Sequence, residues 1–171
     1  MRTLVLDPPP PEFEALLEWR RRWGADRRDE VWEGVLHMNP APNLAHGELV
    51  AQLIATLMPA AKAASLIVSD QFNLGQGPGD YRIPDVGLHR QRGGTWLASA
   101  ALAAEIRSPG DESWDKLPFY ATHQVEELLI VDPDKRTVHW LALEQGEYRA
   151  VERSRLIDLG PAELAEQIDW P

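Results

Sequence analysis

The chain has no cysteine, which excludes disulfides, thiol nucleophiles and thiolate metal ligands. Any metal site would therefore depend on histidine and carboxylate side chains. The chain also lacks an uninterrupted apolar run of membrane-spanning length, and its first residues lack the apolar core of a signal peptide. We therefore expect a cytoplasmic protein with no membrane partner.

Positive charge is scarce as well. The chain has 17 Lys and Arg against 27 Asp and Glu, a net charge of −10, which disfavours a surface that binds nucleic acid by general phosphate neutralisation. Its densest basic segment is Trp19 to Arg28, and a weaker one comprises Arg82, Arg90 and Arg92. We interpret the first as the basic end of a helix, where the dipole favours cations, with a local nucleic-acid patch as the alternative.

The length of 171 residues predicts a single domain, 1–171, with residues 1–30 as an N-terminal helical extension. Apolar periodicity and Gly or Pro breaks predict an α/β (mixed α+β) chain. Helices are expected at about 12–23, 44–63, 111–123 and 161–167. Strands are expected at about 31–38 (or a hairpin bent at Gly34), 66–72, 81–89, 101–108, 127–133, 137–144 and 147–152, with a turn or loop at 75–80.

Two of these strands each carry a carboxylate, Asp85 and Glu105. An ionised carboxylate is costly to bury without a partner, so a bound cation is one explanation. If the strands are neighbours, the two acids can converge into an oxygen site of the kind that Mg²⁺ or Mn²⁺ accepts. Pro84 cannot donate to a sheet ladder, so the first strand should be an edge strand or bulged there. Lys116 begins the next helix and can point back to the acids, with Tyr120 one turn later on the same side.

An ordered set of motifs carries a family resemblance. It comprises WEG, a helix opened by His46, IPDVGL, AEIRSPGDE, WDKLPFYA and VEELLIVDP, over about Val31 to Leu143. The set resembles the Uma-two family of restriction endonucleases, within the PD-(D/E)xK nuclease superfamily. The resemblance implies a restriction-endonuclease-like core, with a central mixed sheet flanked by helices and a C-terminal antiparallel meander. It also implies Mg- or Mn-dependent cleavage of phosphodiester bonds in nucleic acid, with Asp85 and Glu105 as the metal ligands.

The resemblance also assigns the catalytic cation. The superfamily lysine normally follows the second acid by two residues, where this chain has Arg107, so the role passes to Lys116, which matches the family's downstream lysine. Glu33, His46, Arg107 and Tyr120 are supporting candidates.

Other interpretations stay open at this stage. The two acids could form structural ion pairs with Arg82, Arg107 or Lys116, and the chain could be a degenerate member that keeps the fold as a binding or regulatory module. Glu33 could face solvent, and His46 could be an interior residue. Metal-independent glycoside chemistry by two carboxylates is weaker, because no aromatic platform is placed near both acids. Seven tryptophans make a homodimer plausible.

Overall fold

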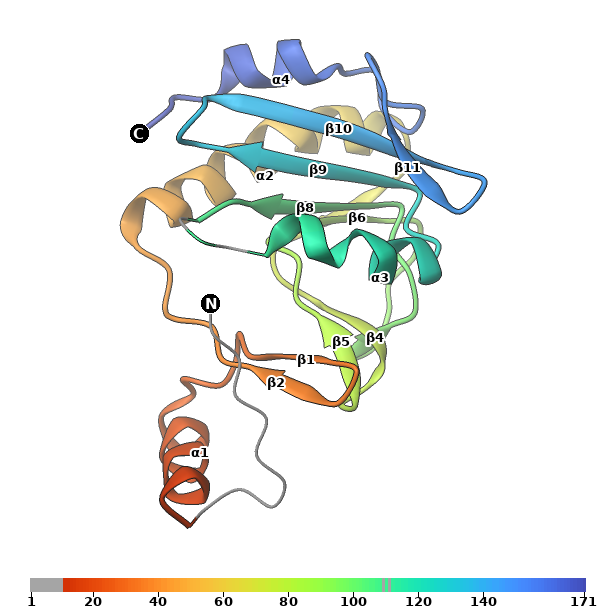
Figure 1. Cartoon of the computed structure of the whole chain (residues 1–171). Coiled ribbons are helices and arrows are strands. Elements are labelled where there is room, and N and C mark those ends of the chain that lie inside the picture. Colours follow the sequence, from red (N-terminus) through yellow and green to blue (C-terminus); the bar gives the residue numbers. More distant parts are fainter. Residues whose placement is uncertain (1–10, 109, 111) are drawn as a thin grey trace.

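The computed structural model describes residues 11–108, 110 and 112–171, and these form two β-sheets and four α-helices. The sequence therefore predicts the mixed α+β class correctly. The main sheet has six strands in the order β11-β10-β9-β8-β6-β3, and the smaller sheet has five in the order β2-β1-β5-β4-β7 (Figure 1). The strands of the main sheet are β3 (Ile67–Ser69), β6 (Val86–His89), β8 (Leu102–Ile106), β9 (Glu127–Asp132), β10 (Thr137–Glu144) and β11 (Glu147–Ala150).

The main sheet is mixed, because β8 and β9 run parallel while its other neighbouring strands are antiparallel. Helices α2 (Leu44–Ala63) and α4 (Pro161–Gln167) lie against one face, and α3 (Leu117–Thr122) lies against the other (Figure 1). Strand β9 is buried along its whole length, as its continuous apolar run predicts for a strand covered on both faces.

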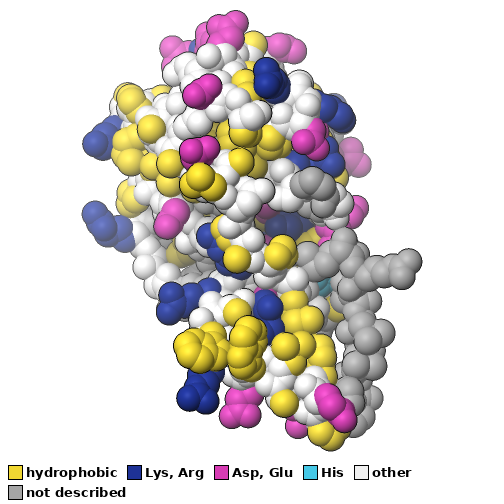
Figure 2. All heavy atoms as spheres, turned by 90° about the vertical axis from the view of Figure 1, so that its left-hand side faces the viewer, with side chains coloured by type: hydrophobic (Ala, Val, Ile, Leu, Met, Phe, Trp, Pro, Cys, Tyr) yellow, Lys and Arg dark blue, Asp and Glu magenta, His cyan; other side chains and the backbone are white. Residues whose placement is uncertain are grey.

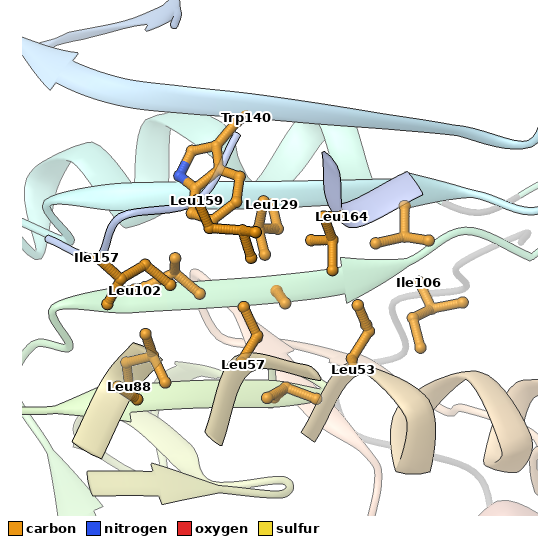
Figure 3. Packing of buried hydrophobic residues seen from close by; sticks show 14 of the residues in the cluster. Leu53, Leu57, Leu88, Leu102, Ile106, Leu129, Trp140, Ile157, Leu159 and Leu164 are labelled. Carbon is orange, nitrogen blue, oxygen red and sulfur yellow. The ribbon is translucent and has the colours of Figure 1, made fainter. Parts of the chain in front are cut away.

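Alternate residues of β8 serve the two faces of this sheet. Leu102 and Ile106 belong to the core beneath α2 and α4, while Ala103 belongs to the core beneath α3. Figure 3 shows Leu53 and Leu57 of α2 packed on the first side. Because side chains alternate along a strand, Glu105 projects to the α3 side, the side on which Ala103 lies.

Helix α2 begins and ends where its sequence pattern predicts. The side chain of Asn43 accepts a hydrogen bond from the backbone N–H of His46, so it caps the helix as expected. Pro59 lies inside the helix and does not end it. By length and composition α2 could cross a membrane, but its buried residues, which include Leu53 and Leu57, lie in the core against the sheet.

The smaller sheet corrects one expectation. Its strands are β1 (Glu30–Trp32), β2 (Val35–His37), β4 (Asn73–Gly77), β5 (Asp80–Arg82) and β7 (Trp96–Leu97). The predicted loop at 75–80 is a hairpin of β4 and β5, in which Gly75 has φ 152° and a Cβ would meet the Asp80 carbonyl at 2.5 Å. Glycine allows this close approach of two backbones, so the strands extend into the predicted turn or loop and leave the turn itself at Pro78 and Gly79.

The predicted strand at 81–89 is also divided in two. Strand β5 belongs to the smaller sheet and β6 to the main sheet, and Pro84 and Asp85 lie in the break between them. Strand β6 lies between β8 and β3, so it is not an edge strand, and in place of the expected bulge the chain passes from one sheet to the other at Pro84. The missing N–H of proline explains why neither ladder runs through this point.

Helix α1 (Pro11–Trp23) lies apart from both sheets, beside the hairpin of β1 and β2 (Figure 1). It has no buried residue. Arg20 joins its end to the start of β1 through a pair of hydrogen bonds to Asp29, at 3.1 and 2.5 Å. The first ten residues of the predicted extension lie outside the described residues.

Candidate active site

Asp85 is fixed against β8 by its backbone and its side chain. Its N–H donates to the carbonyl of Ala104 at 2.9 Å, and its Oδ2 accepts from the N–H of Ile106 at 2.9 Å. Strands β6 and β8 pair directly, so the expectation that the two acid-bearing strands are neighbours is confirmed. Burial raises the pKa of Glu105, and Asp85 lies close enough to Glu105 for its charge to raise that pKa further.

Glu105 lies on β8 beneath the helical segment that follows the strand. That segment is a 3₁₀ turn, η1 (Ser113–Lys116), followed by α3, so the helix expected from about 111 starts as 3₁₀, and residue 111 itself is outside the described residues. The Nζ of Lys116 donates to Oε1 of Glu105 at 2.9 Å, and the hydroxyl of Tyr120 donates to the same oxygen. The structure thus brings Asp85, Glu105, Lys116 and Tyr120 together.

Glu30 also belongs to this cluster, although it is not among the residues predicted from the sequence. It lies on β1, is buried, and its Oε1 accepts from Nζ of Lys116 at 2.9 Å and from the N–H of Ile83 at 2.8 Å. Its Oε2 accepts from Nε1 of Trp32 at 2.7 Å. A signal was present in the sequence, since alternation places Glu30 and Trp32 on one face of the strand.

His46 reaches the cluster from the first turn of α2. Its Nε2 lies 3.0 Å from Oδ1 of Asp85. This hydrogen bond raises the pKa of His46, with burial acting against it and the charge of Asp85 adding to it. The Asn43 cap fixes the first turn and thereby the position of the imidazole.

Burial and charge oppose each other strongly at the centre of the cluster. Burial raises the pKa of Glu105 to about 7, against the charge of Lys116, while Asp85 and Glu30 raise it further. Burial alone would lower the pKa of Lys116, but the charges of Glu105 and Glu30 outweigh it and hold the pKa above its usual value. Lys116 is therefore a fixed cation at neutral pH, surrounded by more negative charge than it can neutralise.

A cavity of about 470 Å³ lies beside this cluster. Its lining includes Glu30, His46, Asp85, Glu105 and Lys116, and also Arg28, Trp32 and Asn39. Its donor set fits a hard divalent cation, because Mg²⁺ typically takes one or two protein carboxylates and keeps several waters. Among the described residues, no group of three His, Asp or Glu side chains is placed to hold a metal ion. Asp85 and Glu105 are the carboxylates that would hold the ion.

Two supporting candidates lie elsewhere. Glu33 is exposed in the turn between β1 and β2, where its N–H donates to Asp80, so the N-terminal acid of the cluster is Glu30 and not Glu33. Glu33 and Gly34 have φ of 50° and 87°, as a type I′ hairpin turn requires, and this turn carries Glu33 away from the face of Glu30. Arg107 follows Glu105 by two residues, and its Nη1 contacts Asp132 at 2.5 Å. It does not line the cavity.

Comparisons with known proteins identify the fold and the family of the chain. A solved structure described as "a putative nuclease belonging to DUF820", from Anabaena variabilis, is similar to the chain, with a TM-score of 0.66 and 16% identity over 81% of this chain and 90% of that one. At this identity the similarity establishes the fold. None of the curated proteins compared with the sequence matches it. A family model, Uma2, described as "Putative restriction endonuclease", matches residues 10–168. The chain therefore belongs to the Uma2 family, as its motifs predict.

Proposed function

We propose that the chain hydrolyses phosphodiester bonds of nucleic acid in the cavity around Asp85 and Glu105, with bound Mg²⁺ or Mn²⁺. The observation that supports this most is the buried convergence of Lys116 on Glu105, beside Asp85. Nuclease-like fold and family membership supply the reaction class. Asp85 and Glu105 would hold the ion, which supplies Lewis acidity and lowers the pKa of a water.

In the reaction, a water molecule loses a proton and its oxygen forms a bond to phosphorus. The bond from phosphorus to the leaving sugar oxygen breaks, and that oxygen takes up a proton. Lys116 uses two of its three N–H donors on Glu30 and Glu105. The third can donate to a phosphate oxygen or orient the attacking water. Because Lys116 stays protonated, its role is to stabilise the negative charge that develops on the phosphate.

Neighbouring groups keep these side chains in place. Tyr120 donates to Glu105 and so favours its ionised form, the form that can bind a cation. Glu30 anchors the ammonium of Lys116 from the opposite side. His46 orients Asp85, with Oδ1 facing the imidazole and Oδ2 held by the backbone of Ile106.

A degenerate member that keeps the fold as a binding module is the competing function. It predicts that Lys116 turns to solvent, whereas Lys116 is buried against Glu105. The observation in favour of a binding module is that Arg107 occupies the usual position of the catalytic lysine. The side chain of Arg107 contacts Asp132. The geometry around Lys116 therefore favours the catalytic proposal.

The test is cleavage of supercoiled plasmid and of labelled single- and double-stranded oligonucleotides with Mg²⁺ or Mn²⁺. We expect Asp85→Asn and Glu105→Gln to lower the rate by at least about 10³-fold, because each removes a charge that the cation requires. Asp134→Asn, an exposed acid in the β9–β10 turn, is the matched control. A wild-type protein that binds no Mn²⁺ by calorimetry and cleaves no substrate would overturn the proposal.

A further inference from the structure

Helix α1 presents an apolar face that the described residues leave uncovered. Leu16, Trp19 and Trp23 are exposed at 42, 56 and 69%, and their spacing places them on one face of the helix. Phe13, Leu17 and Arg20, on the adjacent side of the helix, are half-buried. Figure 2 shows hydrophobic and basic side chains side by side over the lower part of the molecule, where α1 lies. Exposed tryptophans in this number indicate a binding surface.

The end of α1 and the segment after it concentrate positive charge in an acidic chain. From Trp19 to Arg28 there are five arginines against one aspartate, while the whole chain carries −10. Arg20 is paired with Asp29, but no ion pair between described residues involves Arg21, Arg22, Arg27 or Arg28. Arg21, Arg22 and Arg27 are exposed. Two of the three acidic residues of α1, Glu12 and Glu14, lie in its first turn, and the third, Glu18, lies one turn before Arg21 and Arg22.

This surface is continuous with the candidate active site. Arg28 lines the cavity, and its carbonyl accepts from the side-chain amide of Asn39, another lining residue, at 2.8 Å. The Arg20–Asp29 pair fixes the end of α1 to the start of β1, where Glu30 enters the cluster. The arginines between Arg20 and Arg28 thus follow the segment that connects the end of α1 with the cavity of Asp85 and Glu105.

We propose that the Arg–Trp surface, defined as Trp19, Arg22, Trp23 and Arg27, binds a single-stranded segment of nucleic acid and leads it into the cavity. This proposal rests on the proposed nuclease function for the fate of the strand. Unpaired arginines neutralise phosphates, and exposed indoles stack on unpaired bases of any sequence. A duplex keeps its bases paired and offers no such stacking faces, so the tryptophans favour a single strand.

Charge complementarity decides against the other occupants. A second copy of this chain would cover the tryptophans but would leave the arginines to find acidic partners on that copy. A membrane surface would suit tryptophan and arginine as well, but lipid headgroups stay in the bilayer and cannot be led into the cavity that Arg28 lines. A flexible polyanion with aromatic bases satisfies both features of the surface.

The test is binding of a fluorescent oligothymidine, followed by anisotropy in EDTA so that no cleavage occurs. We expect Trp19→Ala/Trp23→Ala and Arg22→Gln/Arg27→Gln each to raise Kd at least about tenfold, because each removes one of the two interactions. The arginine variant should also lower the slope of log K against log salt by about 1.4. The matched control, Arg92→Gln/Arg136→Gln, changes two exposed arginines elsewhere and should stay within twofold of wild type.

The outcomes separate the two proposals. A wild type that binds the oligonucleotide in EDTA but cleaves no substrate with Mg²⁺ or Mn²⁺ would retain the surface and reject the nuclease. Cleavage with unchanged Kd in both surface variants would do the reverse. A wild type that does not bind the oligonucleotide would overturn the single-strand proposal. So would surface variants that keep the wild-type Kd for the oligonucleotide but lose self-association in sedimentation or binding to anionic vesicles. Circular dichroism establishes that the variants are folded.

Discussion

Glu30 and Glu33 lie three residues apart in very different environments. Glu30 is buried with three hydrogen-bond donors, one of them Lys116, whereas Glu33 is exposed in the hairpin turn. Glu30 lies on the strand β1, and the turn that follows carries Glu33. The contrast provides a matched pair of substitutions for the role of the N-terminal acid.

We predict that Glu30→Gln lowers the cleavage rate by about 10- to 100-fold, the usual effect of removing a group that positions an active-site residue. The substitution also removes a negative charge that holds the pKa of Lys116 above its usual value. The alkaline limb of the pH–rate profile should therefore move to lower pH. Glu33→Gln should leave both quantities at wild-type values, and an equal loss in the two variants would contradict the assignment.

His89 gives a pH prediction that is independent of catalysis. It is buried on β6, where its Nε2 lies 2.8 Å from the hydroxyl of Ser69 and its ring meets Phe72 edge-on. Burial lowers the pKa of His89. The unfolded chain therefore takes up this proton first as pH falls, so the contribution of His89 to stability is complete above its unfolded pKa of about 6.5 and is lost as pH falls through the lower folded value.

We expect the free energy of unfolding of wild type to fall more steeply than that of His89→Gln as the pH is lowered below about 6.5. Urea denaturation at a series of pH values measures both. His46, whose pKa is raised, acts in the opposite direction, but it is present in both proteins and cancels in the comparison. Parallel curves for the two proteins would show that His89 does not titrate during unfolding.

At the scale of elements, local patterns predicted most of the fold. The apolar run of β9 and the Asn43 cap of α2 carry strong signals within a few residues, and the structure confirms both elements. The contact between Glu30 and Lys116 carries no such local signal, because Lys116 lies 86 residues further along the chain. The hairpin of β4 and β5 was missed for another reason, since its glycines serve a close backbone approach that composition alone does not distinguish from a loop.

Pro59 shows how tertiary packing overrides a local preference. Proline inside a helix removes one backbone hydrogen bond and crowds the preceding turn, yet α2 continues through it to Ala63. The buried stripe of α2, which includes Leu57 and Ala61 on either side of the proline, holds the helix against the sheet. The helix therefore retains a local strain that a substitution can relieve.

We predict that Pro59→Ala raises the free energy of unfolding by about 1 to 2 kcal/mol, the gain from a restored hydrogen bond less the lost rigidity of the unfolded chain. Pro59 is exposed, so no core contact is lost. Chemical denaturation measures the change. Pro42→Ala, an exposed proline before the helix, is the control and should lower stability slightly or leave it unchanged.

At the scale of the whole molecule, the net charge of −10 means that any added cation relieves some repulsion between acidic side chains. Stabilisation by Mn²⁺ would therefore not by itself identify a site. Specific binding differs because it depends on Asp85 and Glu105, whose carboxylates lie buried in one cavity. Site-directed variants separate these two contributions.

We predict that Mn²⁺ raises the Tm of wild type beyond the effect of NaCl at equal ionic strength. At a hundredfold excess over Kd, one site adds about 2.7 kcal/mol, which for a chain of this size is roughly 5–10 °C. Asp85→Asn should lose this excess shift, while Asp134→Asn, which makes the same change in net charge on the surface, should keep it. An equal shift in both variants would mean that Mn²⁺ acts only through the overall charge, and the paired carboxylates would then be structural.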